Sequence, residues 1–441
     1  MGILTSLRPR ASTATSLAFL LAAALSPVPA TSRAQTIAIT GGKVYPVSGP
    51  AIENGTVLIR DGRIVAVGAN VPVPADARRV DATGKWVTPG LINSSTHLGL
   101  VDIGAVPETR DYAARGRDGV AAAFRAVDGL NPRSVYVAPA REDGVTSVVV
   151  APAGGMVSGQ AAFVDLLQAN SATDMTVRAP LAMVAQLENA GSAGAGARGE
   201  LLLRMRELLE DARVFGQNRR AYDAGSSRSL VASRSDLEAL QPVLDGKLPL
   251  LVSVNRASDI QAAIRLARDY GVKLMISGGA EAWEVAGELA EARVPVLTGA
   301  LTNIPTSFAS LGSRQDNAAL LRRAGVTVLI TGDGGADPTA FNVRNLRYAA
   351  GNAVAYGMSW DEALRAITLA PAEAFGLGDR YGALQAGGVA NVVVWTGDPF
   401  EFTTSAEHVF VRGREIAEET RQEELEERYR KLPPSYYPPP H

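Results

Sequence analysis

The chemistry open to this chain is limited first by its histidines, because it has only three: His97, His408 and His441. His97 follows a short apolar run that predicts a strand, so its imidazole is a candidate ligand or substrate contact, or a strand-end group bonded to its neighbours. Asp333 follows another apolar run and precedes two glycines. Its carboxylate is either an acid at a site or the cap of the next turn. Cysteine is absent, which excludes disulfides, thiolate metal sites and cysteine nucleophiles.

Ser95 lies two residues before His97, which raises the question of a Ser–His–Asp assembly with Asp333. Neighbours at i and i+2 on one strand rarely orient for proton transfer, so the spacing argues against such a triad. His408 lies on the last β segment and His441 at the terminus. One imidazole therefore remains for a site, and a metal centre built from four imidazoles is excluded.

Two kinds of element must position these residues. Residues 36–87 form short β-branched runs separated by Gly41-Gly42, Asn54-Gly55 and Asp61-Gly62, which predict hairpins. From residue 91, apolar runs alternate with helical stretches, with the clearest strands at 147–151, 250–255, 273–277, 294–298 and 327–331. This alternation predicts βα units, and a doubly wound sheet stays open as the alternative to a barrel.

We therefore predict an α/β fold with a (β/α)₈ TIM-like barrel over residues 91–379. Residues 36–90 and 380–414 are predicted to form a small β-sandwich domain from both chain ends. Residues 415–441 are predicted as a charged helix and a Pro-rich tail. Capping boxes are expected at residues 235–238 and 359–362, and Ser258 is expected to cap a helix that ends at Gly271.

Residues 1–34 resemble a secretory signal peptide, with arginines before an apolar run and small residues at a cleavage site before Gln35. The mature protein is therefore expected in the periplasm or outside the cell. With 43 Lys and Arg against 45 Asp and Glu, the net charge of −2 lacks the basic excess of a nucleic-acid binder. No integral membrane role is expected.

Several motifs carry a resemblance to the amidohydrolase superfamily, in the branch of imidazolonepropionase and related metal-dependent hydrolases. The first motif is Asp81-Ala-Thr-Gly-Lys-Trp-Val-Thr-Pro-Gly-Leu-Ile92, before the first barrel strand. The second is Asn342-Val-Arg-Asn-Leu-Arg347, whose arginines either form salt bridges or bind a carboxylate. The others are Glu362-Ala-Leu-Arg-Ala-Ile-Thr-Leu-Ala-Pro371 and Gly387-Gly-Val-Ala-Asn-Val-Val-Val-Trp395. The resemblance covers nearly all of the mature chain.

The resemblance implies one or two divalent ions, held by His-x-His on the first strand, single histidines on the fifth and sixth, and Asp on the eighth. Such a metal makes a hydroxide that attacks a C–N carbonyl. This chain departs from that pattern at most ligands. Asn93 and Ser95 stand on the first strand where the family has Asp and His. Ser253 and Asn255 occupy the fifth-strand segment and Gly278 the sixth-strand position.

His97 and Asp333 are the ligands that remain, and Glu188 lies near a bridging position. The resemblance thus implies catalysis by Asp333 and at most one weakly bound ion, zinc or manganese, at His97, Asp333 and Glu188. Ser95, Asn255 and Arg256 are the expected substrate contacts. The expected ligand is a small amide, cyclic amide or peptide-like molecule.

Two functions stay open. The first is an exported hydrolase of C–N bonds with a degraded metal site. The second is a non-catalytic barrel that binds a ligand or acts as a partner subunit, as a homo-oligomer or paired with an active relative.

Overall fold

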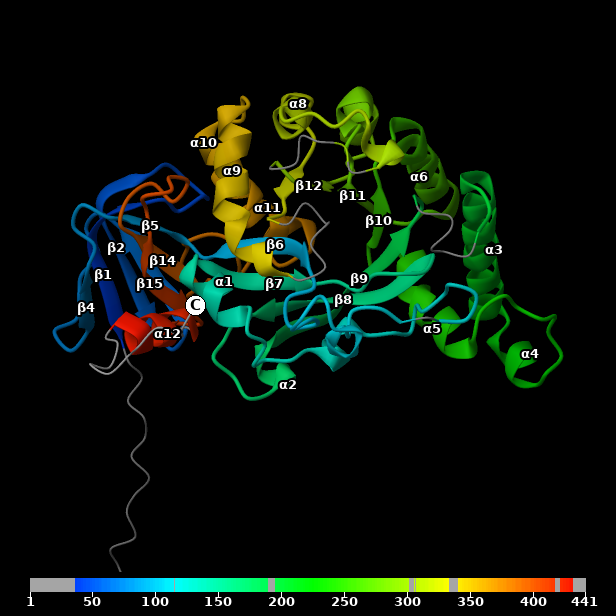
Figure 1. Ribbon diagram of the computed structural model, residues 1–441, viewed down its shortest axis with the longest axis horizontal. Coiled ribbons are helices and arrows are strands. Elements are labelled where there is room, and N and C mark those ends of the chain that lie inside the picture. The colour runs from blue at the N-terminus through cyan, green and yellow to red at the C-terminus, as the bar shows by residue number, and fades with distance from the viewer. Residues whose placement is uncertain are drawn as a thin grey trace, which may run out of the picture.

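The computed structural model of the chain describes residues 36–114, 116–188, 195–300, 305, 307–332, 340–416 and 421–430. The predicted signal peptide and Pro-rich tail lie outside these residues. Two sheets of eight strands each organise the described part, one forming a barrel and one drawing strands from both chain ends. The predicted α/β fold class is thereby confirmed (Figure 1). The exact domain boundaries stay a prediction.

The barrel sheet follows chain order from its first strand to its last, β6-β7-β8-β9-β10-β11-β12-β13. Seven of these strands run parallel, but β8 runs antiparallel to both of its neighbours. The strands are β6 (Leu91–Thr96), β7 (Val145–Val150), β8 (Val157–Asp165), β9 (Thr176–Gln186), β10 (Leu250–Val254), β11 (Leu274–Gly278), β12 (Val296–Thr298) and β13 (Val328–Ile330).

The reversal of β8 departs from a strict (β/α)₈ repeat, and its cause is local. A turn through Gly154 and Gly155, with φ of 90° and 68°, reverses the chain directly after β7. Antiparallel neighbours need only such a short turn, whereas parallel neighbours need a crossover. Residues 97–136 pass alongside this hairpin, with bridges from Val120 to Val157 and from Arg125 to Gln160. A loop thus replaces a helix on this side of the barrel.

Helices cover the remaining strands, as Figure 1 shows for α6 and α8 beside β10–β12. The helices up to β10 are α1 (Val137–Glu142), α2 (Ala172–Met175), α3 (Arg198–Gln217), α4 (Arg219–Asp223) and α5 (Arg234–Leu244). Those that follow are α6 (Ala257–Tyr270), α7 (Ala286–Glu291), α8 (Asn317–Arg323), α9 (Leu346–Ala355), α10 (Trp360–Ala366), α11 (Leu369–Ala374) and α12 (Arg421–Arg430). No helix in these described ranges is long and apolar enough to cross a membrane.

Two of the predicted helix ends agree with the structure, and two do not. The capping box of Ser359 and Glu362 is present at α10, and α6 ends at Gly271 in the left-handed region, with φ of 68°. The box expected at residues 235–238 is wrong, because Ser233 caps α5 by accepting from the Asp236 N–H. Ser258 does not cap α6 either, since that helix already begins at Ala257.

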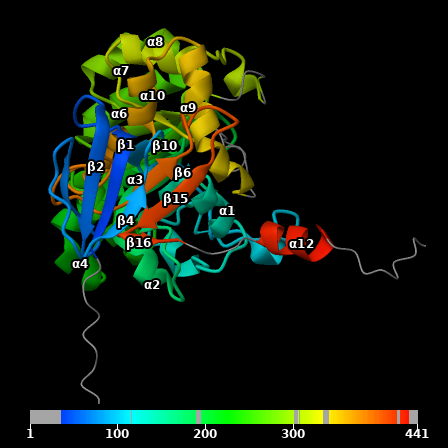
Figure 2. The same ribbon diagram turned by 90° about the vertical axis from the view of Figure 1, so that its left-hand side faces the viewer.

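The second sheet has the order β16-β15-β14-β5-β1-β2-β3, with β4 paired to β1. Its core of hydrophobic side chains comes from both chain ends, including Ile37 and Phe410. The strands are β1 (Ile37–Val44), β2 (Ile52–Arg60), β3 (Arg63–Gly68), β4 (Arg78–Asp81), β5 (Trp86–Pro89), β14 (Val392–Trp395), β15 (Ala406–Val411) and β16 (Arg414–Glu415). Figure 2 shows this sheet face-on, with α12 standing away from it.

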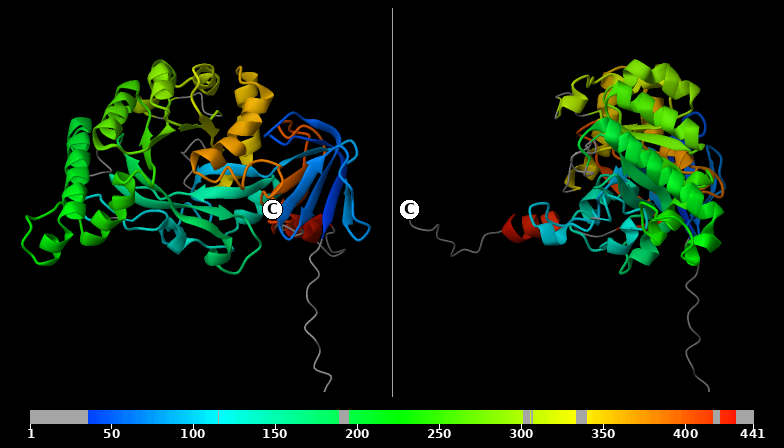
Figure 3. Two further views of the ribbon diagram at one scale, coloured as in Figure 1. Left: turned by 180° about the vertical axis from the view of Figure 1, so that it is seen from behind. Right: turned by 90° about the vertical axis from the view of Figure 1, so that its right-hand side faces the viewer.

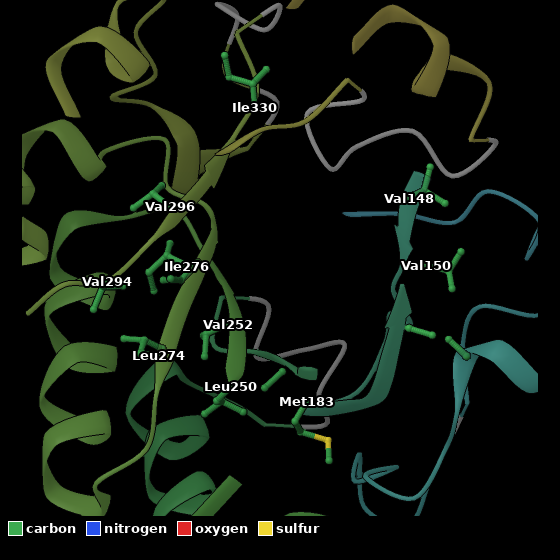
Figure 4. Close-up of a cluster of buried hydrophobic side chains, with 14 of the residues drawn as sticks. Val148, Val150, Met183, Leu250, Val252, Leu274, Ile276, Val294, Val296 and Ile330 are labelled. Carbon is green, nitrogen blue, oxygen red and sulfur yellow. The ribbon is translucent and has the colours of Figure 1, made fainter. Parts of the chain in front are cut away.

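The barrel strands alternate between two apolar layers. Leu250 and Val252 belong to the outer cluster that helices cover (Figure 4), whereas Leu251 belongs to the inner cluster. This is the two-residue period of a strand. Phe375 and Tyr381, which follow α11, join the inner cluster and close the barrel interior. In the rear and side views of Figure 3, the helices lie around the barrel and the second sheet lies at one side.

Candidate functional site

His97 lies directly after β6, at the carboxyl end of a barrel strand, where active sites of this architecture gather. Its Nδ1 lies 2.9 Å from the carbonyl oxygen of Ala151. A carbonyl only accepts, so Nδ1 donates and the lone pair of the neutral ring is on Nε2. The ring also stacks on Tyr112, with centroids 4.2 Å apart. Tyr112 comes from the loop of residues 97–136 and carries no sequence signal for this contact.

On β6, Ser95 stands where the resemblance implies a ligand histidine and Asn93 where it implies an aspartate, and Asn93 has a structural part here. Asn93 is fully buried, and its Oδ1 accepts from the Ser95 N–H at 3.2 Å. The Nδ2 of Asn93 has no hydrogen-bond partner among the described residues. The amide of Asn93 thus holds the backbone that leads to His97, while Ser95 is half-buried beside it.

Asn255 and Glu188 are brought together from the ends of β10 and β9. Nδ2 of Asn255 donates to Oε2 of Glu188 at 2.8 Å, and Oδ1 of Asn255 accepts from the Ala280 N–H at 3.1 Å. The carbonyl of Asn255 accepts from the Glu281 N–H at 2.9 Å. We call this set of contacts the Asn255 bridge. It joins the mouth ends of three neighbouring strands, β9, β10 and β11.

The backbone conformation of Gly278, at the sixth-strand position, is compatible with this bridge. Its φ of 93° lies in the range that side-chain-bearing residues rarely adopt. A Cβ added here would lie 2.7 Å from Oδ1 of Asn255, inside van der Waals contact. A histidine at residue 278 is therefore incompatible with the Asn255 bridge.

Glu281, three residues after Gly278, was not among the residues predicted for the site. Its Oε2 accepts from the Ala257 N–H at 3.0 Å, and its Oε1 accepts from the Gly312 N–H at 3.3 Å. A carboxylate stabilises the first turn of a helix through such a bond. Glu281 therefore holds the start of α6, which directly follows Arg256.

Arg256, the residue before α6, is half-buried, and its guanidinium makes no hydrogen bond or ion pair with residues in the described ranges. Arg344 and Arg347, by contrast, reach Asp143. Nε of Arg344 lies 2.7 Å from Oδ2 of Asp143, and Arg347 donates to its Oδ1. The second-motif arginines therefore form salt bridges, as one of the two interpretations expected.

Asp333, the predicted catalytic acid and metal ligand, lies outside the described residues. Within those residues, no three His, Asp or Glu side chains gather so as to hold a metal ion. Glu188 already accepts from Asn255, and Gly278 supplies no side chain. In the described residues, the fifth- and sixth-strand segments carry Asn255 and Gly278 where the resemblance implies histidines, and Asn255 is engaged in the Asn255 bridge.

Comparison with known proteins gives the same family at three levels. A sequence profile of the amidohydrolase family matches residues 246–416. Imidazolonepropionase from Acidiphilium cryptum (strain JF-5) is 26% identical over 375 residues, which are 79% of this chain and 89% of that protein. The amidohydrolase from Thermotoga maritima MSB8 has a similar structure, with a TM-score of 0.78 and 27% identity over 86% of this chain and 99% of that one.

A longer relative matches as well. Amidohydrolase tasK from Hapsidospora irregularis is 23% identical over 391 residues, which are 81% of this chain. The aligned part is 39% of tasK, so the chain spans about two fifths of the length of that relative.

Proposed function

Because the chain belongs to the amidohydrolase superfamily, we propose that its barrel mouth binds a small amide or peptide-like molecule without a tightly held pair of metal ions. The similarity to imidazolonepropionase, an enzyme named for a ring amide, supports this class of ligand. In this proposal the protein is a ligand-binding barrel whose ancestral metal site has been replaced.

The Asn255 bridge is the observation that carries the proposal. Asn255 stands in the segment where the family has a metal-binding histidine, and it donates to the carboxylate of Glu188 instead. An amide nitrogen is not a metal ligand, because its lone pair is delocalised. The bridge therefore uses Glu188 and the strand ends to build a hydrogen-bonding surface.

The mouth residues complement the parts of such a ligand. Arg256 offers a planar, permanently charged fork that matches a carboxylate. Glu188 is an acceptor for an amide N–H. Ser95, on β6, offers a hydroxyl. A dipeptide or an acyl amino acid has all three complementary groups.

A second candidate is hydrolysis with one weakly bound ion at His97, Asp333 and Glu188. The observation in its favour is the His97 ring, whose Nδ1–H donates to a backbone carbonyl, as in histidines that ligate metals. A divalent ion would supply an activated water there. Three ligands are the fewest that catalytic zinc sites use.

Calorimetry with the dipeptide Ala-Pro and with hydantoin, which lacks a carboxylate, tests the proposal. We expect Arg256→Gln to weaken Ala-Pro at least about tenfold, since a charge-assisted bond contributes roughly 1.5–3 kcal/mol. Hydantoin binding should change little. The matched control is Arg265→Gln on the exposed side of α6, which should leave both affinities unchanged.

Mass spectrometry of the same mixtures separates the two candidates. Binding of the probes with no hydrolysis product, with or without added zinc or manganese, is the expected result. Hydrolysis that requires added metal and is lost in His97→Ala supports the second candidate. If neither probe binds, or if Arg256→Gln binds Ala-Pro as the wild type does, the proposed ligand class is wrong.

The proposal includes export. The arginines, apolar run and small residues of residues 1–34 support it. Pairing with another copy or with an active relative is part of the same proposal for a non-catalytic barrel.

A further inference from the structure

A large cavity lies at the end of the barrel opposite the mouth. Its volume is about 1450 Å³, and it opens beside the amino-terminal ends of β9, β10, β11 and β12. Pockets for organic ligands are usually about 300–1,000 Å³. The cavity is thus large enough for such a ligand, and none of the proposed mouth residues lines it.

The inner surface of the cavity is partly apolar. Met275 and Phe375, which line it, also belong to the inner barrel cluster, and Leu274 and Val294 belong to the outer one. Figure 4 shows Leu274 and Val294 on the side of the barrel that carries the helices. An apolar chain or ring entering here would be removed from water against these side chains.

The charges that line the cavity do not cancel one another. Arg268, Lys273 and Arg293 line it, and none has an ion pair in the described part of the chain. Arg178 donates to the carbonyls of Phe375 and Gly376, which leave its charge uncompensated. Lys247 is paired with Asp245.

Three acids also line the cavity, and one of them is held in an ion pair. Glu373 is paired with Arg365, and Glu288 accepts from Nε2 of Gln261 at 2.6 Å. Glu291 is the third acid of the lining. The cavity therefore combines a partly apolar lining with more cationic than acidic side chains, which leaves an excess of positive charge.

From this combination we propose that the cavity is a second binding site, for an organic carboxylate with an apolar body. The apolar part lies against Leu274, Met275 and Phe375, and the carboxylate meets the cations at the rim. Arg and Lys both bind carboxylates, and Arg does so with two parallel bonds.

Substitution of Arg293 tests the role of the positive charge at the cavity rim without loss of the fold. Its φ is 54°, a left-handed conformation that glycine adopts without strain. Arg293→Gly therefore removes a cation while relieving the backbone. Arg268→Gln and Lys273→Gln replace exposed side chains, for which effects on stability are typically within about 0.5 kcal/mol.

Calorimetry with octanoate tests the proposal, with octanamide as the uncharged analogue and inorganic phosphate as the anion without an apolar body. We expect octanoate to bind one site, at least about tenfold more tightly than octanamide or phosphate. The triple variant Arg268→Gln, Lys273→Gln, Arg293→Gly should weaken octanoate at least about tenfold. Arg265→Gln, an exposed arginine of α6 outside the cavity lining, should bind octanoate as the wild type does.

Three results would overturn the inference. The first is no octanoate binding to the wild type. The second is equal affinity for octanoate and octanamide, which would remove the carboxylate from the recognition. The third is an unchanged octanoate affinity in the triple variant, which would place the ligand elsewhere. None of these results bears on Ala-Pro binding at the mouth.

Discussion

Replacement of Asp165 with alanine should lower the free energy of unfolding by about 3–5 kcal/mol, because it breaks a buried ion pair by removing one partner. The side chain of Asp165 is 0% exposed, and Nε of Arg412 lies 2.5 Å from its Oδ2. Ser147 Oγ and Asn391 Nδ2 donate to its Oδ1 at 2.8 and 3.0 Å. Ser147 belongs to β7, Asn391 directly precedes β14 and Arg412 directly follows β15, so Asp165 joins the two sheets.

Tyr381 completes this network by donating its hydroxyl to Oδ2 of Asp165 at 3.0 Å. Burial, and then the charge of Asp165, raise the pKa of Tyr381 far above its ordinary value, so the phenol stays a donor. In Asp165→Ala the Tyr381 hydroxyl and the Arg412 guanidinium lose this acceptor together. Each buried group left without a partner adds to the loss of stability.

The midpoint of urea unfolding measures this effect, at an unchanged slope. Asp165→Asn, which keeps the shape but not the charge, should fall between the wild type and Asp165→Ala. The matched control Asp379→Asn, at a carboxylate whose side chain is 74% exposed, should change stability by less than about 0.5 kcal/mol. A loss in Asp165→Ala no larger than that of the control would show that the network does not stabilise the fold.

The second large effect is expected at Gly278. Gly278→Ala should lower stability by about 1–3 kcal/mol for its left-handed backbone alone, and further because the new Cβ displaces Asn255. Gly278→His restores the family's residue type, yet it should behave like Gly278→Ala and should not create a metal site. We expect this because the positive φ at residue 278 and the contact of an added Cβ with Asn255 both oppose a side chain there.

Gly287→Ala is the matched control for this substitution. Gly287 lies in α7, where an added Cβ meets no atom within 4 Å. Alanine in a helix is more favourable than glycine, so this variant should gain up to about 1 kcal/mol. If Gly278→Ala is as stable as Gly287→Ala, the conformation assigned to the mouth is wrong.

The sequence predicted the fold class because repeated local signals agreed with one another. The alternation of apolar runs with helical stretches predicted the barrel. A motif at each chain end predicted the second sheet. Asp61-Gly62 forms the predicted hairpin turn between β2 and β3, with φ of 52° and 74°. Gly41-Gly42 and Asn54-Gly55 do not form turns. They lie opposite each other within β1 and β2, where the register shifts.

The reversal of β8 was not predictable from its pattern. Eight of its nine residues are buried, so the strand lacks the alternation that marks one exposed face. A buried antiparallel strand reads the same as a buried parallel one, and only the short connection distinguishes them. The Asp165 network was equally hidden, since its members lie far apart in the sequence and meet only when both sheets have formed.

At the site, the sequence predicted that most ligands of the family pattern are absent, but it did not predict the contacts that the structure shows there. The pairing of Glu188 with Asn255 depends on how the ends of β9 and β10 approach each other, which spacing alone does not give. The side chain of Glu281 holds backbone that is distant in sequence, at Gly312, and no motif marks such a bond. The roles predicted for Asp333, Ser95 and Arg256 stay predictions.

Elemental analysis of the purified protein tests most directly the central claim that the Asn255 bridge has replaced the binuclear metal centre. The protein is incubated with zinc or manganese, dialysed, and its metal content measured per chain. We predict no retained pair of ions, and any single weakly bound ion should be lost in His97→Ala. Two equivalents of metal per chain that survive dialysis would contradict the account.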